Sequence, residues 1–405
     1  MTGPLDGLRV FDLTRILAGP TCTQLLADLG ADVIKIERPG EGDDTRRWGP
    51  PYVERPDGTE SDISAYFLSS NRNKRSLTID IAKEEGQRLA LNLIAKSDIV
   101  VENFKVGGLA KFGLDYASVV SVKPEIIYSS ITRFGQTGPY APRAGYDYLA
   151  QGMGGIMSLT GEPDGDPLKV GVGIADVVCG MYASTAILAA LHYREKTGRG
   201  QYIDLALLDT QVAWLINEGC NYLVSGKVPQ RLGSEHPNIV PYKVMPSSDG
   251  YFILAVGNNG QFKKFCDFAG VPELAEDPRF ASNALRVANR EALYEILPKI
   301  TVTKSLDEWV EGLSAIGVPC GPVNTLDRVF SDPHLLGRGM RISMPEPGSA
   351  KGEVEMIGNP VKMSETPVSY RRPPPHLGAH SDEVLREVLG LSDADVAKLR
   401  DDGVV

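Results

Sequence analysis

The chain has 405 residues, of which 42% are hydrophobic and 23% charged, and its formal net charge is −10. These values are ordinary for a soluble globular protein of two or three domains, and the negative charge disfavours nucleic acid or anionic membranes as partners. The first residues show no signal-peptide pattern, and the five cysteines lack the spacing of metal sites or redox pairs. We therefore expect a cytoplasmic protein with reduced thiols and no metal site.

Strands and helices alternate in the first third of the chain. The apolar and β-branched pattern predicts strands at 8–13, 31–37, 75–81, 98–104 and 125–132, with helices at 21–30 and 83–97. This alternation predicts an α/β fold with a Rossmann-like, doubly wound and mostly parallel sheet. Two long apolar helices are predicted near 177–195 and 205–224, the first of them buried in a core.

The composition changes after about residue 226. Residues 243–257 read as an antiparallel hairpin with Asp249-Gly250 at its turn, and helical patterns follow over 258–316. The tail 373–390 reads as a proline-rich linker followed by a helix capped by Ser381.

Two stretches resemble parts of a dinucleotide-binding motif, which needs glycines where the backbone approaches a pyrophosphate. The turn 14–20 contains Gly19 as its only glycine, and "GVGIAD" (171–176) has Asp176 where the third glycine belongs. A carboxylate there repels a pyrophosphate, so the sequence excludes NAD. The crevice at the strand ends remains a predicted site for another nucleotide-bearing ligand.

Asp176 itself allows two interpretations. It directly precedes a helical pattern, so it could be the N-cap of the helix at 177–195. The same position could make it a nucleophile, because a helix N-terminus favours the ionised carboxylate and the flanking glycines leave room for a substrate. One residue can serve both purposes.

The chain resembles the family III CoA-transferases along nearly its whole length. The matching stretches, in chain order, are 5–40, "NRNKRSLTID" (71–80), "VENF" (101–104), "FGQTGPY" (134–140), "GYDYLAQGMGG" (145–155), "KTGRGQYIDLALLD" (196–209), "GVPCGPVN" (317–324) and "LGAHSDEVL" (377–385). The resemblance implies that Asp176 is the catalytic nucleophile and carries CoA as an aspartyl thioester. Coenzyme A and acyl-CoA would then be substrates, and no prosthetic group is implied.

The resemblance also implies an architecture and a CoA site. It implies an interlocked homodimer, with a large domain in 1–225, a small α+β domain in 226–325 and a return to the large domain in 326–405. The residues implied to bind CoA are Arg38, Asn103, Phe104, Lys105 and Lys111. A lysine common in relatives is Ala82 here, and Lys83 follows it. The loop implied to cover the nucleophile corresponds to "VGNNGQF" (256–262).

Several residues bear on the reaction. Racemases of the family carry a histidine base where this chain has Tyr146, and tyrosine, with a pKa near ~10, is a poor base at neutral pH. Arg15 and Leu17 differ from the oxalate-specific branch, whereas 238–244 and 257–262 resemble the succinyl-CoA:glutarate branch. We therefore predict a CoA-transferase from an acyl-CoA, with succinyl-CoA favoured, to a small dicarboxylate-like acid. The alternatives are a 2-methylacyl-CoA racemase and a CoA-binding protein without turnover.

The acceptor site is predicted from basic side chains, because arginine binds a carboxylate through a bidentate fork. The predicted substrate-binding residues are Arg15, Arg46, Arg47 and Tyr146. Arg133 is a further candidate, for which a carboxylate clamp and a plain surface residue are equally supported.

Overall fold

The computed structural model describes residues 3–405, which form two compact units. Unit 1 contains the chain up to Ile156 together with Lys169–Leu223 and Pro333–Val405, and unit 2 contains Met157–Leu168 and Val224–Asp332. The main part of unit 2 runs from residue 224 to 332, whereas the small domain was expected over 226–325. The short segment Met157–Leu168 was not expected in unit 2. It joins that unit because the Arg231 guanidinium donates to the carbonyls of Glu162 and Gly165 at 3.1 and 2.6 Å.

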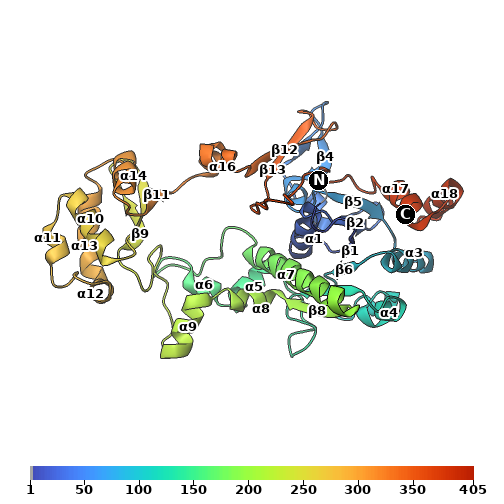
Figure 1. The fold of residues 1–405 in the computed structure, drawn as a ribbon, viewed down its shortest axis with the longest axis horizontal. Coiled ribbons are helices and arrows are strands. Elements are labelled where there is room, and N and C mark those ends of the chain that lie inside the picture. The colour runs from blue at the N-terminus through green and yellow to red at the C-terminus, as the bar shows by residue number, and fades with distance from the viewer. Residues whose placement is uncertain (1–2) are drawn as a thin grey trace. The chain divides into compact units, whose positions relative to one another are not determined.

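Unit 1 is built on a six-stranded parallel sheet with the strand order β5-β2-β1-β6-β7-β8 (Figure 1). This confirms the predicted α/β class and its large parallel sheet. The strands are β1 (Arg9–Leu13), β2 (Asp32–Glu37), β5 (Lys74–Thr78), β6 (Ile99–Glu102), β7 (Ile127–Thr132) and β8 (Gln201–Ala206).

Alternate residues of the strands face two separate cores, as the pleat requires. Phe11 and Ile34 face a core closed by α3 (Glu84–Ala95), α4 (Tyr116–Val122), α17 (Ser381–Leu389) and α18 (Asp393–Asp401). Val10 and Val33 face the other core, closed by α1 (Ala18–Asp28) and α7 (Ile174–Thr197). The sheet is thus covered by helices on both faces, and the chain crosses from one face to the other.

The prediction of a single helix over 205–224 was wrong. Residues Gln201–Ala206 form the edge strand β8, and the helix that follows is divided into α8 (Leu207–Ala213) and α9 (Ile216–Ser225), whose first residue, Ile216, has φ +43°. The strand forms because Tyr202, Ile203 and Leu205 pair in register with β7. The apolar pattern alone does not distinguish a short edge strand from the start of a helix.

The remaining elements of unit 1 are short. They include two antiparallel hairpins and several one- or two-turn helices near the sheet. The bounds are η1 (Asp44–Arg47), β3 (Tyr52–Glu54), β4 (Glu60–Ser64), α2 (Ala65–Leu68), η2 (Ala110–Phe112), α5 (Asp147–Met153), α16 (Pro333–Gly337), β12 (Arg341–Pro345) and β13 (Glu353–Ile357). Helix α17 begins at Ser381 itself, with His380 at its N-cap position, one residue before the predicted cap.

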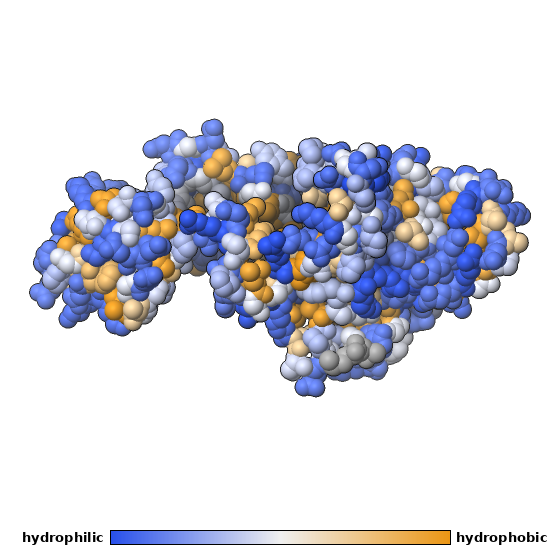
Figure 2. Space-filling model, turned by 90° about the horizontal axis from the view of Figure 1, so that it is seen from above, coloured by the Kyte–Doolittle hydropathy of each residue, from blue (hydrophilic) through white to orange (hydrophobic). Residues whose placement is uncertain are grey.

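Helix α7 is long and apolar enough, by length and composition, to span a membrane, but 44% of its most apolar window is buried inside the protein. Its buried residues include Cys179, Ala183 and Ile187, four residues apart on the face that packs into the core with α1. Gly180 permits close packing on α1, since a Cβ there would lie 2.5 Å from the Ala18 carbonyl oxygen. The face of the molecule in Figure 2 is largely hydrophilic, with hydrophobic side chains in separate patches.

Unit 2 contains a three-stranded antiparallel sheet in the order β11-β10-β9, surrounded by helices. The hairpin of β9 (Tyr242–Pro246) and β10 (Tyr251–Ala255) matches the predicted hairpin, and Phe252 stacks on the buried Trp309 in the core. The other elements are α6 (Ile156–Leu159), which begins at the last residue of unit 1, α10 (Asn259–Ala269), α11 (Glu273–Glu276), α12 (Asn283–Ala288), α13 (Arg290–Thr301), α14 (Leu306–Ala315), β11 (Cys320–Pro322) and α15 (Leu326–Ser331).

Candidate active site

Asp176 lies in the first turn of α7 but does not cap the helix. Helix α7 starts at Ile174 with Gly173 at the N-cap position, so the predicted helix start at 177 was wrong by one turn. The capping acceptor is Asp147 of α5, whose Oδ1 accepts from the backbone N–H of Ala175 at 2.8 Å and of Asp176 at 3.3 Å. The Asp176 carboxylate therefore has no capping duty, and within residues 3–405 its oxygens accept no hydrogen bond.

A small cavity exposes this carboxylate. Its volume is about 40 Å³, and it lies at the carboxyl ends of the central strands. Its lining includes residues from six separate stretches of unit 1: Arg15, Leu17, Asn103, Thr132, Arg133, Tyr146, Asp176 and Leu207. The fold thus brings together Asp176 and two of the predicted substrate-binding residues, Arg15 and Tyr146.

The Asp176 environment disfavours its charged form. Burial, and then the negative charge of Asp147, raise the pKa of Asp176 to about 7, while the positive charge of Arg133 opposes the rise. A carboxylate with a raised pKa is also more basic and more nucleophilic when ionised. Burial, and then the charges of Asp176 and Asp147, also raise the pKa of Tyr66 to about 12.

A buried ion pair holds the turn that forms one wall of this cavity. Lys35 Nζ donates to the Thr14 carbonyl at 2.9 Å and to Asp43 Oδ2 at 2.8 Å, with both charged side chains fully buried. Asp43 in turn accepts from the backbone N–H of Ile16 at 3.2 Å. Ile16 has φ +74°, which is strained for a β-branched residue, and such strain is often found at functional sites.

A second, larger cavity of about 410 Å³ opens beside the first, at the carboxyl ends of β1, β2, β5 and β6. Its lining includes Arg15, which the two cavities share, and the predicted CoA residues Arg38 and Phe104. Arg38 is exposed and pairs with Glu41 at 3.2 Å. Cavities at this edge of an open parallel sheet are the usual ligand sites of such folds.

Asn103 lines the small cavity and holds the backbone of Arg15, the residue that both cavities share. Its Oδ1 accepts from the Arg15 backbone N–H at 3.0 Å, and its Nδ2 donates to the Arg15 carbonyl at 2.7 Å. The preceding Glu102 is buried, and its carboxylate accepts from the Phe104 backbone N–H at 2.7 Å and from the Ser130 hydroxyl. The turn that carries Asn103 and Phe104 is therefore held from both sides.

Other predicted residues lie apart from these cavities. Lys105 and Lys111 are exposed and line neither cavity, and Lys111 Nζ lies over the Phe112 ring at 4.5 Å. Lys83 does not replace the lysine missing at Ala82, because its ammonium donates to the carbonyls of Asp402 and Gly403 at 2.6 and 3.0 Å. Ala82 itself lines the larger cavity.

Arg46 was predicted to bind the acceptor, and the structure contradicts this. Its buried guanidinium donates Nε and Nη2 to the two oxygens of Glu37, both at 2.8 Å, and Nη2 also donates to the Pro375 carbonyl. Arg46 is therefore a structural residue. Arg47 is exposed and lines neither cavity, whereas the neighbouring Trp48 packs edge-on against Tyr66.

The sequence reading missed Asp147, Tyr66 and Glu102. Asp147 stands inside a stretch already noted for Tyr146, so the only available signal was its adjacency. The loop expected to cover the nucleophile contains Asn258, which caps α10 by accepting from the Gln261 backbone N–H at 2.9 Å. That loop belongs to unit 2 and Asp176 to unit 1.

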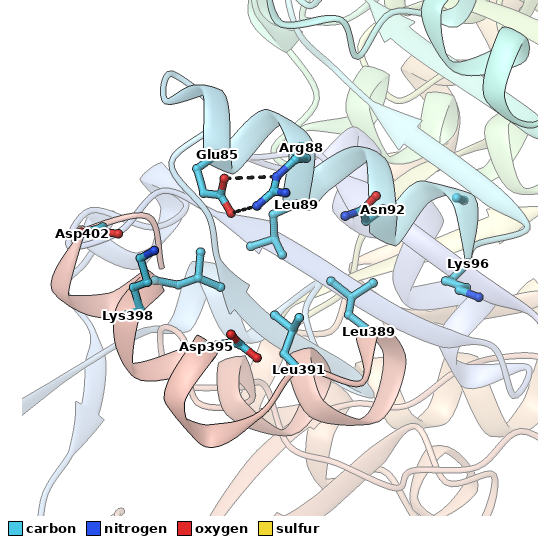
Figure 3. Close-up of a pocket in the computed structure, with 12 residues that line it drawn as sticks. Glu85, Arg88, Leu89, Asn92, Lys96, Leu389, Leu391, Asp395, Lys398 and Asp402 are labelled. Atoms are coloured by element: carbon cyan, nitrogen blue, oxygen red, sulfur yellow. Dashed lines mark hydrogen bonds and ion pairs between the residues drawn. The ribbon is translucent and has the colours of Figure 1, made fainter.

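A third hollow, of about 570 Å³, lies between α3 and the C-terminal helices (Figure 3). Leucines from both sides form its floor, and Glu85 and Arg88 on its rim pair with each other. It is larger than the other two, but two of its carboxylates are already engaged, Glu85 with Arg88 and Asp395 with Ser392. In residues 3–405 no three metal-binding side chains are grouped so as to hold an ion.

A carboxylate beside two cavities, at the ligand-binding edge of a parallel sheet, is an arrangement suited to an enzyme with a covalent nucleophile. The chain belongs to CoA-transferase family III, whose family model matches residues 5–381. The predicted family and enzyme class are thereby confirmed, with CoA thioesters as substrates.

Individual relatives agree with this assignment. Succinate–glutarate CoA-transferase of Agrobacterium fabrum is 49% identical over 386 residues, which cover 95% of this chain and 96% of the relative. Succinyl-CoA:glutarate CoA-transferase of Homo sapiens is 43% identical over 402 residues, covering 99% of this chain and 90% of the relative. A crystal structure of a CAIB/BAIF family protein from Brucella suis matches with a TM-score of 0.85 at 50% identity, covering 96% of this chain and all of that one (100%).

Proposed function

We propose that this protein transfers CoA from succinyl-CoA to glutarate, through a covalent thioester on Asp176. The observation that carries the proposal is the Asp176 carboxylate, which lines a cavity and is released from capping by Asp147. The named relatives support the two substrates, since both are succinate–glutarate CoA-transferases. They favour neither the racemase nor the non-catalytic alternative.

The reaction then proceeds by exchanges between activated acyl groups. The Asp176 carboxylate attacks the thioester carbonyl of succinyl-CoA, forming a mixed anhydride and releasing the CoA thiolate. The thiolate attacks the aspartyl carbonyl, which gives an aspartyl-CoA thioester and free succinate. Glutarate attacks this thioester, and the released thiolate takes the glutaryl group from the second anhydride. Asp176 is regenerated as a carboxylate.

The start of α1 is suited to stabilise the oxyanions of these steps. Leu17, at the N-cap position of α1, and Ala18 line the cavity, and the Leu17 side chain makes no capping hydrogen bond. Free backbone N–H groups at a helix N-terminus favour negative charge. Without a capping bond from Leu17 they are available to a substrate oxygen.

The larger cavity is the proposed site of the CoA nucleotide, in the manner of a Rossmann-like sheet. Arg38 supplies an exposed cation for a phosphate, and Phe104 supplies an aromatic surface at the same edge. Lys105 and Lys111 would act only at the outer end of a long ligand, because they line neither cavity. Tyr146, which lines the small cavity, remains a proposed acceptor contact, and Arg47, which lines neither cavity, would reach the acceptor only from outside.

The direct test is to incubate the purified protein with succinyl-CoA and glutarate and to separate the CoA esters by chromatography. We expect glutaryl-CoA to appear at the rate at which succinyl-CoA disappears. Deuterium entering the α-carbon of a branched acyl-CoA without any acid would instead support a racemase. Absence of exchange with glutarate, and with labelled succinate, would refute the proposed function.

We further propose that the protein is a homodimer, as the family resemblance implies. Large apolar side chains of α7 and α9 are exposed in the single chain, among them Met181 at 54%, Tyr182 at 47% and Leu223 at 80%. A second copy covering them would remove an apolar surface that monomeric soluble proteins rarely leave open. A cytoplasmic location remains a prediction.

Sedimentation analysis at micromolar concentration is expected to give about twice the chain mass of 43.8 kDa. Met181→Asp combined with Leu223→Asp is expected to shift the protein toward the single-chain mass, because a buried carboxylate without a partner destabilises an interface. Val122→Asp, at a residue that is 55% exposed on α4, is the matched control. A monodisperse single chain in the unmodified protein would rule out the dimer.

A further inference from the structure

Arg133 follows strand β7 and lies beside the nucleophile. Its guanidinium is anchored on one side only, where Nε donates to the Gly145 carbonyl at 2.7 Å. The ring of Tyr146 lies 5.9 Å from Cζ, so the planar group is oriented as well as held. Within residues 3–405 the two terminal nitrogens of Arg133 make no hydrogen bond or ion pair.

The charge of Arg133 acts on the reacting carboxylate without neutralising it. Arg133 and Asp176 line the same cavity, and Arg133 is the cation that opposes the raised pKa of Asp176. The two side chains form no ion pair, so a small anion can bind to the arginine while the nucleophile stays available.

The other arginines near the cavity are engaged elsewhere. Arg15 Nη1 pairs with Asp44 at 3.0 Å, and its Cζ lies 5.8 Å from the centre of the Phe104 ring. Arg46 is held by Glu37 inside unit 1. Arg133 is thus the cavity-lining arginine whose bidentate face remains free for a ligand.

Building on the proposed function, we propose that Arg133 determines specificity by binding the carboxylate that does not react. In a double-displacement reaction the donor acyl group and the acceptor acid occupy the same place at Asp176 in turn. Succinyl-CoA and glutarate share one feature there: each has a carboxylate at the end of the acyl chain that is remote from the reacting carbon. A single fixed guanidinium can serve both, first the succinyl group and then the glutaryl group.

The test compares Arg133→Gln with the unmodified enzyme, by kcat/KM for each substrate separately. We expect kcat/KM for glutarate and for succinyl-CoA each to fall by about 10- to 100-fold, which is the usual worth of a charge-assisted hydrogen-bonded pair. With butyrate and butyryl-CoA, which lack the second carboxylate, we expect changes of less than about threefold. Arg133→Lys should recover part of the loss, because it keeps the charge but not the fork.

The matched control is Arg143→Gln, since Arg143 is exposed, lies over the Tyr140 ring at 4.1 Å and lines neither cavity. It should leave kcat/KM unchanged for glutarate, succinyl-CoA, butyrate and butyryl-CoA. An equal fall in kcat/KM for glutarate and butyrate would show that Arg133 merely supports the backbone at Gly145. The inference would also be overturned if kcat/KM for glutarate did not fall, or if it fell for only one of glutarate and succinyl-CoA. An unmodified enzyme that transfers CoA to no acid would instead refute the proposed function, and the inference with it.

Discussion

Asp176→Asn is expected to lower the rate of CoA transfer by at least about 10³-fold while the protein stays folded. The amide cannot form the anhydride or the thioester, and removal of a covalent nucleophile leaves only binding and oxyanion stabilisation. The measurement is steady-state transfer from succinyl-CoA to glutarate. Mass spectrometry after exposure to succinyl-CoA should show a CoA adduct on the unmodified chain and none on the variant.

The structure also predicts how this variant folds. Burial and the charge of Asp147 raise the pKa of Asp176 to about 7, whereas the unfolded chain has a value of about 3.9. Below about pH 4 the carboxyl is therefore protonated in both states, and the folded state carries no penalty for a buried charge. As the pH rises through about 7, the free energy of unfolding of the unmodified protein falls, because Asp176 must then ionise while partly buried. The unfolding temperature of Asp176→Asn minus that of the unmodified protein should therefore be larger at pH 8 than at pH 4.

Two results would contradict this account. A variant that keeps a tenth of the activity would show that Asp176 is not the nucleophile. Loss of folding would indicate that Asp176 rather than Asp147 caps α7. As a control for capping, Asp147→Ala should lower the free energy of unfolding by about 1 kcal/mol, because it leaves the N–H groups of Ala175 and Asp176 without an acceptor.

The second large effect is on the pH profile. The free enzyme should lose kcat/KM for succinyl-CoA below about pH 7, by about tenfold per pH unit, because attack requires the ionised Asp176. At pH 5 the value should be about 100-fold below its plateau. Asp147→Asn removes the second cause of the raised pKa but keeps an oxygen for capping, so it should move the acid limb to lower pH.

Another buried carboxyl must be separated from this effect. Burial raises the pKa of Glu102 to about 7 as well, and Glu102 holds the turn that carries Asn103. Glu102→Gln should leave the acid limb in place if Asp176 is the titrating group. If the acid limb of the pH profile disappears in Glu102→Gln, or does not move in Asp147→Asn, Asp176 is not the titrating group.

The buried ion pair of Arg46 shows where reading the sequence fails. Arg46 and Arg47 are neighbours in a charged, proline-rich loop and look alike as acceptor ligands. In the structure, Glu37 and the carbonyl of Pro375 hold Arg46, and the second of these lies 329 residues away. Nothing in the local pattern around residue 46 reveals a partner at that separation.

The sequence by itself determined the α/β class, most of the strands of the large sheet, the family and Asp176 as the candidate nucleophile. These follow from local alternation and from short contiguous stretches, which a linear reading preserves. Only the tertiary structure decided that Asp147 caps α7, that Arg46 is buried and that Arg133 faces the cavity with free donors. The physical reason is that a charged side chain is available to a ligand only if no other part of the fold satisfies it, and those partners are brought together by packing rather than by sequence neighbourhood.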